Sequence, residues 1–287
     1  MQHVVVTGVS TGIGRGTAQV LAQRGMHVFG SVRKAEDAAT LSAQLGERFT
    51  PLIFDVTDEA AVRSAADSVR EQLAGDSLAG LVNNAGVAVP GPLLHIPIAD
   101  YRHQIDVNLV GPLIVTQAFA PLMGATRGFA GTPGRIVMIS SVGGRFAGPF
   151  IGPYHASKFG LEGMSDTLRR ELMLYGIDVI VVEPGAVATP IWDKAESVDV
   201  SAYAQTDYAP MLEGYKRYSI SSGRKGLPPE RLGEVIHHAL TTRQPHVRYA
   251  VLRGRLMGFE VPRRLPPRVI DRRIARSLGM RPTSRRA

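Results

Sequence analysis

One stretch decides the fold, Val4-Val5-Val6-Thr7-Gly8-Val9-Ser10-Thr11-Gly12-Ile13-Gly14. In this stretch an apolar, β-branched run leads into a glycine-rich turn, and a helical pattern follows at once. Glycines between a strand and a helix let the backbone approach a pyrophosphate at the positive end of the helix. The spacing is Gly-x-x-x-Gly-x-Gly rather than Gly-x-Gly-x-x-Gly. We expect a dinucleotide-binding turn here, and the alternative is a purely structural turn in another α/β protein.

Apolar, β-rich runs alternate with helical patterns along the chain. This alternation is typical of βαβ units, in which helices cover both faces of a parallel sheet. We expect strands near residues 3–7, 26–32, 50–54, 79–83, 134–140, 177–183 and 247–252. We expect helices near residues 12–24, 35–46, 58–73, 100–125, 153–175 and 229–241. The predicted fold class is α/β: a doubly wound (Rossmann) seven-stranded parallel sheet, with ligands at the carboxyl ends of its strands.

Length and composition bound the architecture. The 287 residues suit one large α/β domain, and a hydrophobic share of 44% supplies an ample core. No repeat or dividing linker is visible, so we expect a single domain over residues 1–260, with a lid at about 190–228 and a basic tail over 261–287. The chain has no cysteine and begins without a basic region or a cleavable apolar stretch, which favours a reducing, cytoplasmic location.

Residues 107–126 carry no charge and approach membrane-spanning length. They are interrupted by Asn108, Gly111, Pro112 and Pro121, so we interpret them as a buried or interface helix.

Net charge is unevenly distributed. Residues 243–287 hold thirteen arginines against Glu260 and Asp271, a local charge of +11, so the other 242 residues carry −3 of the total of +8. Leu265, Val269, Ile270, Ile274 and Leu278 fall near one face of a predicted helix in this tail, with arginines around them. Such a helix fits an anionic membrane surface, and equally a partner subunit or a solvated tail. We expect no nucleic acid partner, because no recognisable binding module accompanies the charge.

A second stretch carries the chemistry, Tyr154-His155-Ala156-Ser157-Lys158, with Ser141 thirteen residues before Tyr154. In a helix over residues 153–175, Tyr154 and Lys158 form an i, i+4 pair on one face. A phenol has an ordinary pKa of ~10, and a nearby lysine cation draws this pKa toward neutrality. A serine hydroxyl from a neighbouring strand end would hold the substrate oxygen beside the phenol. These groups would move a proton on or off an alcohol or carbonyl oxygen.

The second predicted strand ends in Ser31-Val32-Arg33-Lys34. In dinucleotide folds an acidic residue at this place binds the adenosine ribose, whereas an arginine accommodates a 2′-phosphate. Arg33 therefore predicts NADP(H) as the preferred cofactor, with NAD(H) open if the arginine is only a solvated strand end. Asp55 and Asn83-Asn84-Ala85-Gly86 lie at the next two strand ends. Position alone leaves open whether they bind the local backbone or a ligand.

Taken together, these motifs resemble the short-chain dehydrogenase/reductase family over about residues 3–190. The resemblance rests on Thr7-Gly-x-x-x-Gly-Ile-Gly14, Asp55-Val56, Asn83-Asn84-Ala85-Gly86, Val107-Asn108, Ser140-Ser141, Tyr154-x-x-x-Lys158 and Pro184-Gly185, in family order and spacing. Within the family, Gly30-Ser31-Val32-Arg33 and Arg248-Tyr249 are most similar to the hydroxysteroid and retinol dehydrogenase branch.

The resemblance implies a role for each matching residue. Catalysis would rest on Asn108, Ser141, Tyr154 and Lys158. Cofactor contacts would come from Gly8, Ser10, Gly12, Ile13, Gly14, Arg33, Asp55, Val56, Asn83, Ala85, Gly86, Tyr154, Lys158, Pro184, Gly185, Val187 and Thr189. Asn83 would brace the sheet, and Asn108 would bend the long helix and hold a water that leads protons to Lys158. Tyr154 would protonate the substrate oxygen as hydride leaves the nicotinamide.

Other polar residues fit simpler interpretations. His155 follows Tyr154, but an i+1 neighbour faces elsewhere on a helix, so we expect no catalytic part for it. His237 and His238 have no acidic or cysteine partner at ligand spacing, so we predict no metal site. We interpret Glu171 and Glu183 as helix-surface and strand-end charges.

The lid loses helical periodicity between Thr189 and about Pro228. It carries four tyrosines, Trp192 and Met211, which favour a bulky apolar substrate such as a steroid, a retinoid or another lipid. The alternative is that these side chains only attach the lid to the body.

We therefore expect an NADPH-dependent oxidoreductase that interconverts a secondary alcohol and a ketone, or a primary alcohol and an aldehyde. One alternative is an NAD-dependent dehydrogenase that works oxidatively, and another is a non-catalytic dinucleotide-binding scaffold. The resemblance also implies a homo-oligomer, a dimer or tetramer, built on the helices at 100–125 and 153–175.

Overall fold

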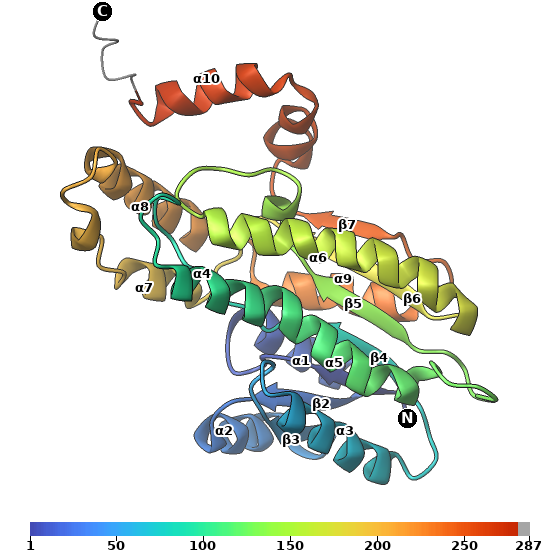
Figure 1. Ribbon diagram of the computed structural model, residues 1–287. Helices are drawn as coiled ribbons and strands as arrows, with labels where there is room; N and C mark the ends of the chain where they lie inside the picture. The colour runs from blue at the N-terminus through green and yellow to red at the C-terminus, as the bar shows by residue number, and fades with distance from the viewer. Residues whose placement is uncertain (281–287) are drawn as a thin grey trace, which may run out of the picture.

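A parallel sheet of seven strands runs through the computed structural model, which describes residues 1–280 (Figure 1). Its strand order is β3-β2-β1-β4-β5-β6-β7. The strands are β1 (His3–Val6), β2 (His27–Val32), β3 (Phe49–Ile53), β4 (Leu78–Asn83), β5 (Arg135–Ile139), β6 (Asp178–Pro184) and β7 (Arg248–Val251). Each strand end lies within one residue of its predicted position. The doubly wound fold class is confirmed.

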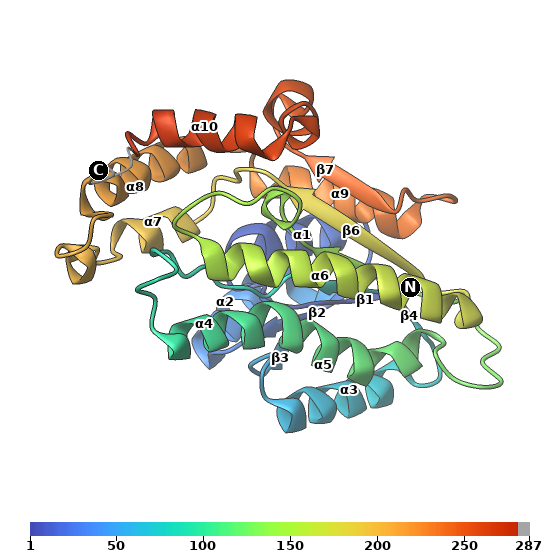
Figure 2. The ribbon, with the colours of Figure 1, turned by 45° about the horizontal axis from the view of Figure 1, so that its top comes forward.

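Helices cover both faces of this sheet (Figures 1 and 2). One face carries α1 (Gly12–Gln23), α2 (Ala35–Leu45) and α9 (Pro229–Thr241). The other face carries α3 (Glu59–Leu73), α4 (Ile98–Ile105), α5 (Gly111–Phe119) and α6 (Gly152–Glu171). The continuous apolar character of the strands, such as Val4-Val5-Val6, follows from this burial on both faces.

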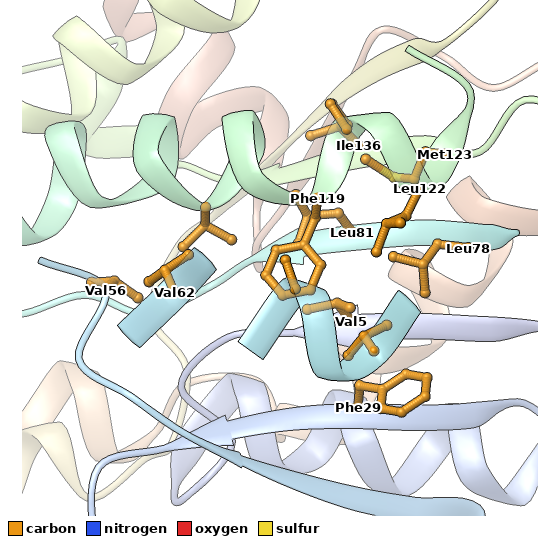
Figure 3. Close-up of a cluster of buried hydrophobic side chains, with 14 of the residues drawn as sticks. Val5, Phe29, Val56, Val62, Leu78, Leu81, Phe119, Leu122, Met123 and Ile136 are labelled. Atoms are coloured by element: carbon orange, nitrogen blue, oxygen red, sulfur yellow. The ribbon is translucent and has the colours of Figure 1, made fainter. Parts of the chain in front are cut away.

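The hydrophobic core divides into one cluster on each side of the sheet. Figure 3 shows the cluster under α3 and α5, where Phe119 and Met123 meet Val5, Leu81 and Ile136 of the strands. All five side chains are fully buried. This packing holds the strand ends in fixed positions, which is the condition for building a site on them.

The long helix predicted at residues 100–125 is a composite. A π-helical turn, η2 (Asp106–Val110), joins α4 to α5, and a 3-10 turn, η3 (Ala120–Met123), ends the run. Asn108 lies in the π turn, at the place where the resemblance implies a bend. By length and composition alone the run Ile98–Met123 would qualify to span a membrane. Its inner side packs in the core through Val115 and Phe119, as the interpretation as a buried helix requires.

The segment expected to form a lid contains helices, so the prediction of an irregular segment at residues 190–228 was wrong. It contains α7 (Ile191–Glu196) and α8 (Ala209–Arg224). Glycine and serine in α8 weaken its helical pattern, and tertiary contacts supply the missing stability. Trp192 covers Gly223, where a Cβ would lie 2.0 Å from the indole, and Arg224 pairs with Asp193.

The helix predicted in the basic tail is present as α10 (Pro267–Ser277). Figure 1 shows it at the top of the view, set apart from the sheet and from the helices that cover it. The last residues of the predicted tail, 281–287, lie outside the described part of the chain.

Candidate active site

The glycine turn after β1 lies where the strand order reverses, between β1 and β4. Gly8 has a positive φ of 70°, and its backbone N–H donates to the Ser31 hydroxyl over 3.0 Å. Gly14, in the first turn of α1, has no room for a side chain: a Cβ would lie 2.2 Å from the Gly8 carbonyl oxygen. Both positions therefore require glycine, and the turn leads directly into the N-terminus of α1, an arrangement that fits a pyrophosphate.

Asn84 and Thr7 join this turn to the end of β4, a role that the sequence analysis did not assign. The Asn84 amide donates to the carbonyl oxygens of Thr7 and Gly8 over 2.8 and 3.1 Å. The Thr7 hydroxyl accepts from the backbone N–H groups of Asn84 and Ala85 over 2.9 and 3.0 Å. Two polar residues at adjacent strand ends were the available signal, since strand neighbours share an edge of the sheet.

Gly14→Ala tests this turn. The added Cβ would collide with the Gly8 carbonyl oxygen and, at 2.4 Å, with the Asn84 amide nitrogen. We expect a loss of about 1–3 kcal/mol in the free energy of unfolding and a failure to bind dinucleotide. Gly214→Ala in α8 is the matched control, because nothing lies within 4 Å of a Cβ there. Chemical unfolding and dinucleotide titration measure both effects, and equal behaviour of the two variants would contradict the description of the turn.

Arg33 follows β2 at the outer edge of the same crevice. Its guanidinium is 3.8 Å from the carboxylate of Asp55, which follows β3, and both side chains are largely exposed. Asp55 also accepts from the backbone N–H and hydroxyl of Thr57. Val56 is buried against Gly111 of α5. The structure therefore brings the predicted adenosine-side residues Arg33, Asp55 and Val56 to one edge of the sheet.

The remaining predicted cofactor contacts divide between the crevice and the core. Thr189 lies against the glycine turn, since a Cβ on Gly12 would be 3.3 Å from it. Asn83 points into the core and donates to the Thr116 hydroxyl over 2.9 Å. It braces the sheet, as expected, and its side chain does not face the crevice. Along the carboxyl edge of the sheet the chain also places Ser10, Ile13, Ala85, Gly86, Pro184, Gly185 and Val187.

The predicted catalytic side chains meet where β5, β6 and α6 converge. Ser141 follows β5, and its hydroxyl accepts from the Gly143 N–H over 2.9 Å and donates to the Pro184 carbonyl over 3.4 Å. Tyr154 and Lys158 lie in the first turns of α6, with the lysine Nζ 5.7 Å from the centre of the phenol ring. Lys158 is 5% exposed and donates to the Ile139 carbonyl over 2.7 Å.

Burial sets the proton affinities at this site. It raises the pKa of the Tyr154 phenol above its ordinary value, and the Ser141 hydroxyl acts in the opposite direction. Burial also lowers the pKa of Lys158 to about 8, against the influence of Glu162 one turn later. We expected a lowered pKa for Tyr154 from the sequence, and the direction is the reverse. The lysine faces the ring rather than the hydroxyl, and desolvation disfavours the phenolate. The phenol is therefore a proton donor at neutral pH.

Asn108 is the brace of this arrangement. Its amide oxygen accepts from the Val87 N–H over 2.9 Å, and its amide nitrogen donates to the Val87 carbonyl and the Ser157 hydroxyl. Ser157 in turn donates to the Tyr154 carbonyl over 2.7 Å. Gln104, which the sequence analysis did not single out, is fully buried and bonds Val87 and Val89 in the same way. The proton-carrying water that the resemblance implies for Asn108 stays a prediction.

Two polar residues make contacts that the sequence analysis did not assign. Glu183 is a strand-end charge of β6, as interpreted, but it is 3% exposed at the side chain and lies 3.4 Å from Arg145 and 3.6 Å from Arg248. Burial, together with the nearby Glu162, raises the pKa of Glu183. The ring of His155 bonds the loop after Ser141 at two points.

The comparisons with known proteins agree with this geometry. The family model described as "short chain dehydrogenase" matches residues 2–199. An NADPH-dependent 3-dehydrocapnine reductase from Ornithobacterium rhinotracheale is 38% identical, and the match covers 95% of each chain. Retinol dehydrogenase 16 from mouse is 34% identical over 87% of this chain and 80% of its own.

Solved structures show the same fold. A short-chain dehydrogenase from Streptomyces avermitilis is 27% identical, with a TM-score of 0.74 and 91% of each chain covered. A short-chain dehydrogenase/reductase from Burkholderia phymatum, solved in complex with NAD, is 23% identical and has a TM-score of 0.76 over 100% of this chain and 98% of its own. The chain belongs to the short-chain dehydrogenase/reductase family and is an oxidoreductase.

Proposed function

We propose that the protein is an NADPH-dependent reductase that converts a ketone or aldehyde of a bulky apolar substrate into the alcohol. The observation that carries this proposal is the convergence of Ser141, Tyr154 and Lys158 where β5, β6 and α6 meet. A phenol carries its proton at neutral pH and can give it to a carbonyl oxygen that the serine hydroxyl holds. A relative named as an NADPH-dependent reductase, 38% identical over 95% of this chain, supports the same direction.

The bound dinucleotide would supply the hydride, and the chain's own residues would supply the rest. Gly8, Gly12 and Gly14 would receive the pyrophosphate, and Lys158 would hold the nicotinamide ribose. Ser141 would donate a hydrogen bond to the carbonyl oxygen. Tyr154 would give its proton to the same oxygen, and Asn108 would keep Ser157 and the start of α6 in place.

The lid supports an apolar substrate. Phe150 lies between the site and the lid, with its ring centre 5.9 Å from that of Tyr208 and 5.4 Å from that of Tyr215, both edge-on. Tyr208 also meets His95 edge-on at 5.9 Å. These contacts place an aromatic cluster at the start of α8 in the lid, and aromatic rings of this kind would offer apolar surface to a bulky substrate.

The proposal is tested with ketones of increasing chain length, each assayed with NADPH and with NADH. Each added methylene is worth ~0.8 kcal/mol when buried, so we expect kcat/KM to rise about fourfold per methylene until the lid is filled. A kcat/KM that does not change with chain length would contradict the proposal of an apolar substrate. Turnover only in the alcohol-oxidising direction with NAD would favour the oxidative alternative. Dinucleotide binding without any turnover would favour the scaffold.

Arg33→Ala tests the cofactor preference. An exposed arginine that meets a 2′-phosphate contributes about 1.5–3 kcal/mol, so we expect NADPH affinity to fall about ten- to a hundredfold while NADH affinity stays unchanged. Arg63→Ala on α3 is the control, because this arginine is equally exposed and pairs only with Glu59. Fluorescence titration with NADPH and with NADH gives the ratio of the two affinities for each protein. An unchanged NADPH preference in Arg33→Ala would overturn the assignment.

We also propose how the remaining parts of the chain serve this reaction. Residues 1–260 would act as one catalytic domain in the cytoplasm, and α5 and α6 would form the contact of a homo-oligomer. Val110, which directly precedes α5, and Phe159 of α6 are 41% and 46% exposed and support that contact.

The basic tail is proposed to touch an anionic membrane surface. Leu256, Leu265 and Val269 are 65%, 38% and 45% exposed among the arginines of residues 253–276. Replacing Arg268, Arg272, Arg273 and Arg276 by glutamine should weaken binding to phosphatidylserine vesicles by about 1 kcal/mol per arginine. Vesicle sedimentation measures this, with neutral phosphatidylcholine vesicles as the control. Equal binding of the wild type and the variant to anionic vesicles would contradict the proposed contact with a membrane surface.

A further inference from the structure

The loop from Ser141 to Phe150 connects the catalytic serine to the lid. It leaves β5, makes the 3-10 turn η4 (Val142–Gly144) and returns to the start of α6. Ser141 stands at its beginning. At its end, Phe150 is buried and has a positive φ of 67°. A residue other than glycine keeps this backbone conformation only when its surroundings hold it. Whatever holds this loop therefore positions both the serine and the aromatic contact with the lid.

His155, the neighbour of Tyr154 in α6, bonds this loop at two points. Its Nδ1 is 2.8 Å from the Gly143 carbonyl oxygen, and its Nε2 is 2.9 Å from the Gly148 backbone nitrogen. The carbonyl can only accept and the backbone N–H can only donate. The imidazole must therefore be neutral, with its proton on Nδ1 and a lone pair on Nε2.

A continuous chain of hydrogen bonds leads from this ring to the catalytic serine. The N–H of Gly143 donates to the Ser141 hydroxyl over 2.9 Å, while the carbonyl of the same glycine meets His155. Gly143 is enclosed between the two: a Cβ there would lie 2.9 Å from His155 Nδ1 and 3.2 Å from Ser141 Oγ. The His155 ring thus fixes the position of the Ser141 hydroxyl relative to the phenol of Tyr154, the residue before His155.

The second bond, to Gly148, reaches the other end of the loop. Gly148 lies two residues before Phe150, whose carbonyl accepts from the Gly91 N–H over 2.8 Å and whose ring meets Tyr208 and Tyr215 of the lid. The middle of the loop is held separately by Arg145, which is 3.4 Å from Glu183 and 3.9 Å from Glu162. Loss of the Gly148 bond would free the end of the loop that faces the lid.

We propose that His155 is a positioning residue of the reaction, which as a neutral imidazole holds the Ser141–Phe150 loop at both ends and releases the Gly148 end when the ring is protonated. It does not touch the substrate oxygen. This inference rests on the proposed reductase function, because it assigns Ser141 and the lid to carbonyl reduction. Protonation places a second donor opposite the Gly148 N–H, so the bond at this end cannot form, while the bond to Gly143 is kept.

The surroundings of the ring favour the neutral state. The titratable group beside it is Tyr154 of the same helix, 6.1 Å away between ring centres. On the facing loop Arg145 is engaged by Glu183 and Glu162. Burial lowers the pKa of His155 from its ordinary value of 6.5, and the bond to the Gly143 carbonyl opposes this shift. The Gly148 end of the loop is therefore held at neutral pH and is released only below the ordinary histidine range.

Three variants separate the two bonds. In His155→Asn the amide N–H can replace Nδ1–H and keep the bond to Gly143. In His155→Gln the amide oxygen can replace Nε2 and keep the bond to Gly148, and it cannot be protonated in this range. His155→Leu keeps neither bond. We expect His155→Leu to lower kcat by about ten- to a hundredfold, with NADPH affinity unchanged, and each amide variant to recover part of the loss.

The pH profile is the readout that a merely structural histidine would not move. We expect reduction by the wild type to fall on the acid side, below the ordinary pKa of the ring, and this acid limb to be absent in His155→Gln. A His155→Leu enzyme that loses only thermal stability, with kcat and the pH profile unchanged, would overturn the proposal.

Nitrogen NMR of the imidazoles tests the tautomer and protonation state of His155 without any substrate. The His155 signal, assigned by its loss in His155→Gln, should show the Nδ1–H tautomer at neutral pH and a pKa below the ordinary value. A ring protonated on Nε2 or charged at neutral pH would refute the proposal. If NMR finds the tautomer but no ketone is reduced by the wild type, the reductase function fails and the loop contact stands.

Discussion

Tyr154→Phe is expected to lower kcat for carbonyl reduction by about 10²–10⁴-fold, the usual contribution of a positioned proton donor. The change removes only the hydroxyl, and the ring remains in place beside Lys158. NADPH affinity should stay within about twofold of the wild type, because the variant retains the glycine turn and Lys158. Steady-state rates and fluorescence titration of NADPH give the two numbers.

Tyr175→Phe is the matched control for this variant. Tyr175 lies at the far end of the helical run that begins with α6, and its ring packs on the core rather than in the site. We expect it to keep full activity. Substantial carbonyl reduction by Tyr154→Phe would remove the phenol from the mechanism, and a parallel loss of NADPH binding would show that the substitution had disturbed the cofactor site.

Lys158→Met is expected to abolish turnover and, unusually, to stabilise the cofactor-free fold. Burial lowers the pKa of Lys158 from 10.5 to about 8, a destabilisation of the charged lysine by about 3 kcal/mol at neutral pH. Methionine fills similar space without a charge, but it leaves the Ile139 carbonyl without the bond that Lys158 donates. We expect a net gain of about 1–2 kcal/mol in the free energy of unfolding.

The gain in stability of Lys158→Met depends on pH because the pKa of Lys158 is lowered in the folded protein. Between the lowered pKa and the ordinary one the unfolded chain binds more protons at this lysine than the folded chain does, so wild-type stability rises with pH. The advantage of Lys158→Met should therefore be full below about pH 8 and should vanish toward about pH 10.5.

Denaturant unfolding of the cofactor-free proteins at neutral pH and at about pH 9.5 measures this difference. Lys216→Met is the control, because Lys216 also donates to a backbone carbonyl, that of Val198, but is only half-buried. A Lys158→Met protein that is less stable than the wild type at neutral pH would contradict the claim that the buried charge of Lys158 destabilises the fold.

The sheet could be predicted closely because its signal is local. Val4-Val5-Val6 and the central strands β4, β5 and β6 are buried on both faces, so each of these strands appears in the sequence as a largely apolar run. The family motif implied a bend at Asn108, whereas the π turn that lies there was not predicted. The two lid helices could not be predicted, because Trp192 packing on Gly223 and the pairing of Arg224 with Asp193 join positions about thirty residues apart.

The composition of the site was predictable, but its electrostatics were not. The motifs brought Ser141, Tyr154 and Lys158 together correctly, because they lie at a strand end and on the adjoining helix. The direction of the Tyr154 shift depends on burial, which no spacing reports. The same holds for Glu183, whose partners Arg145 and Arg248 come from other elements, and for His155, whose partners are loop backbone groups.

The most direct test of the account is to mix the enzyme with NADPH and a long-chain ketone at neutral pH and to follow both the nicotinamide absorbance and the product. The account predicts that one alcohol forms for each NADPH oxidised in the wild type, and that both processes stop in Tyr154→Phe. NADPH oxidation that continues in Tyr154→Phe, or ketones that remain untouched while NADPH binds, would contradict it.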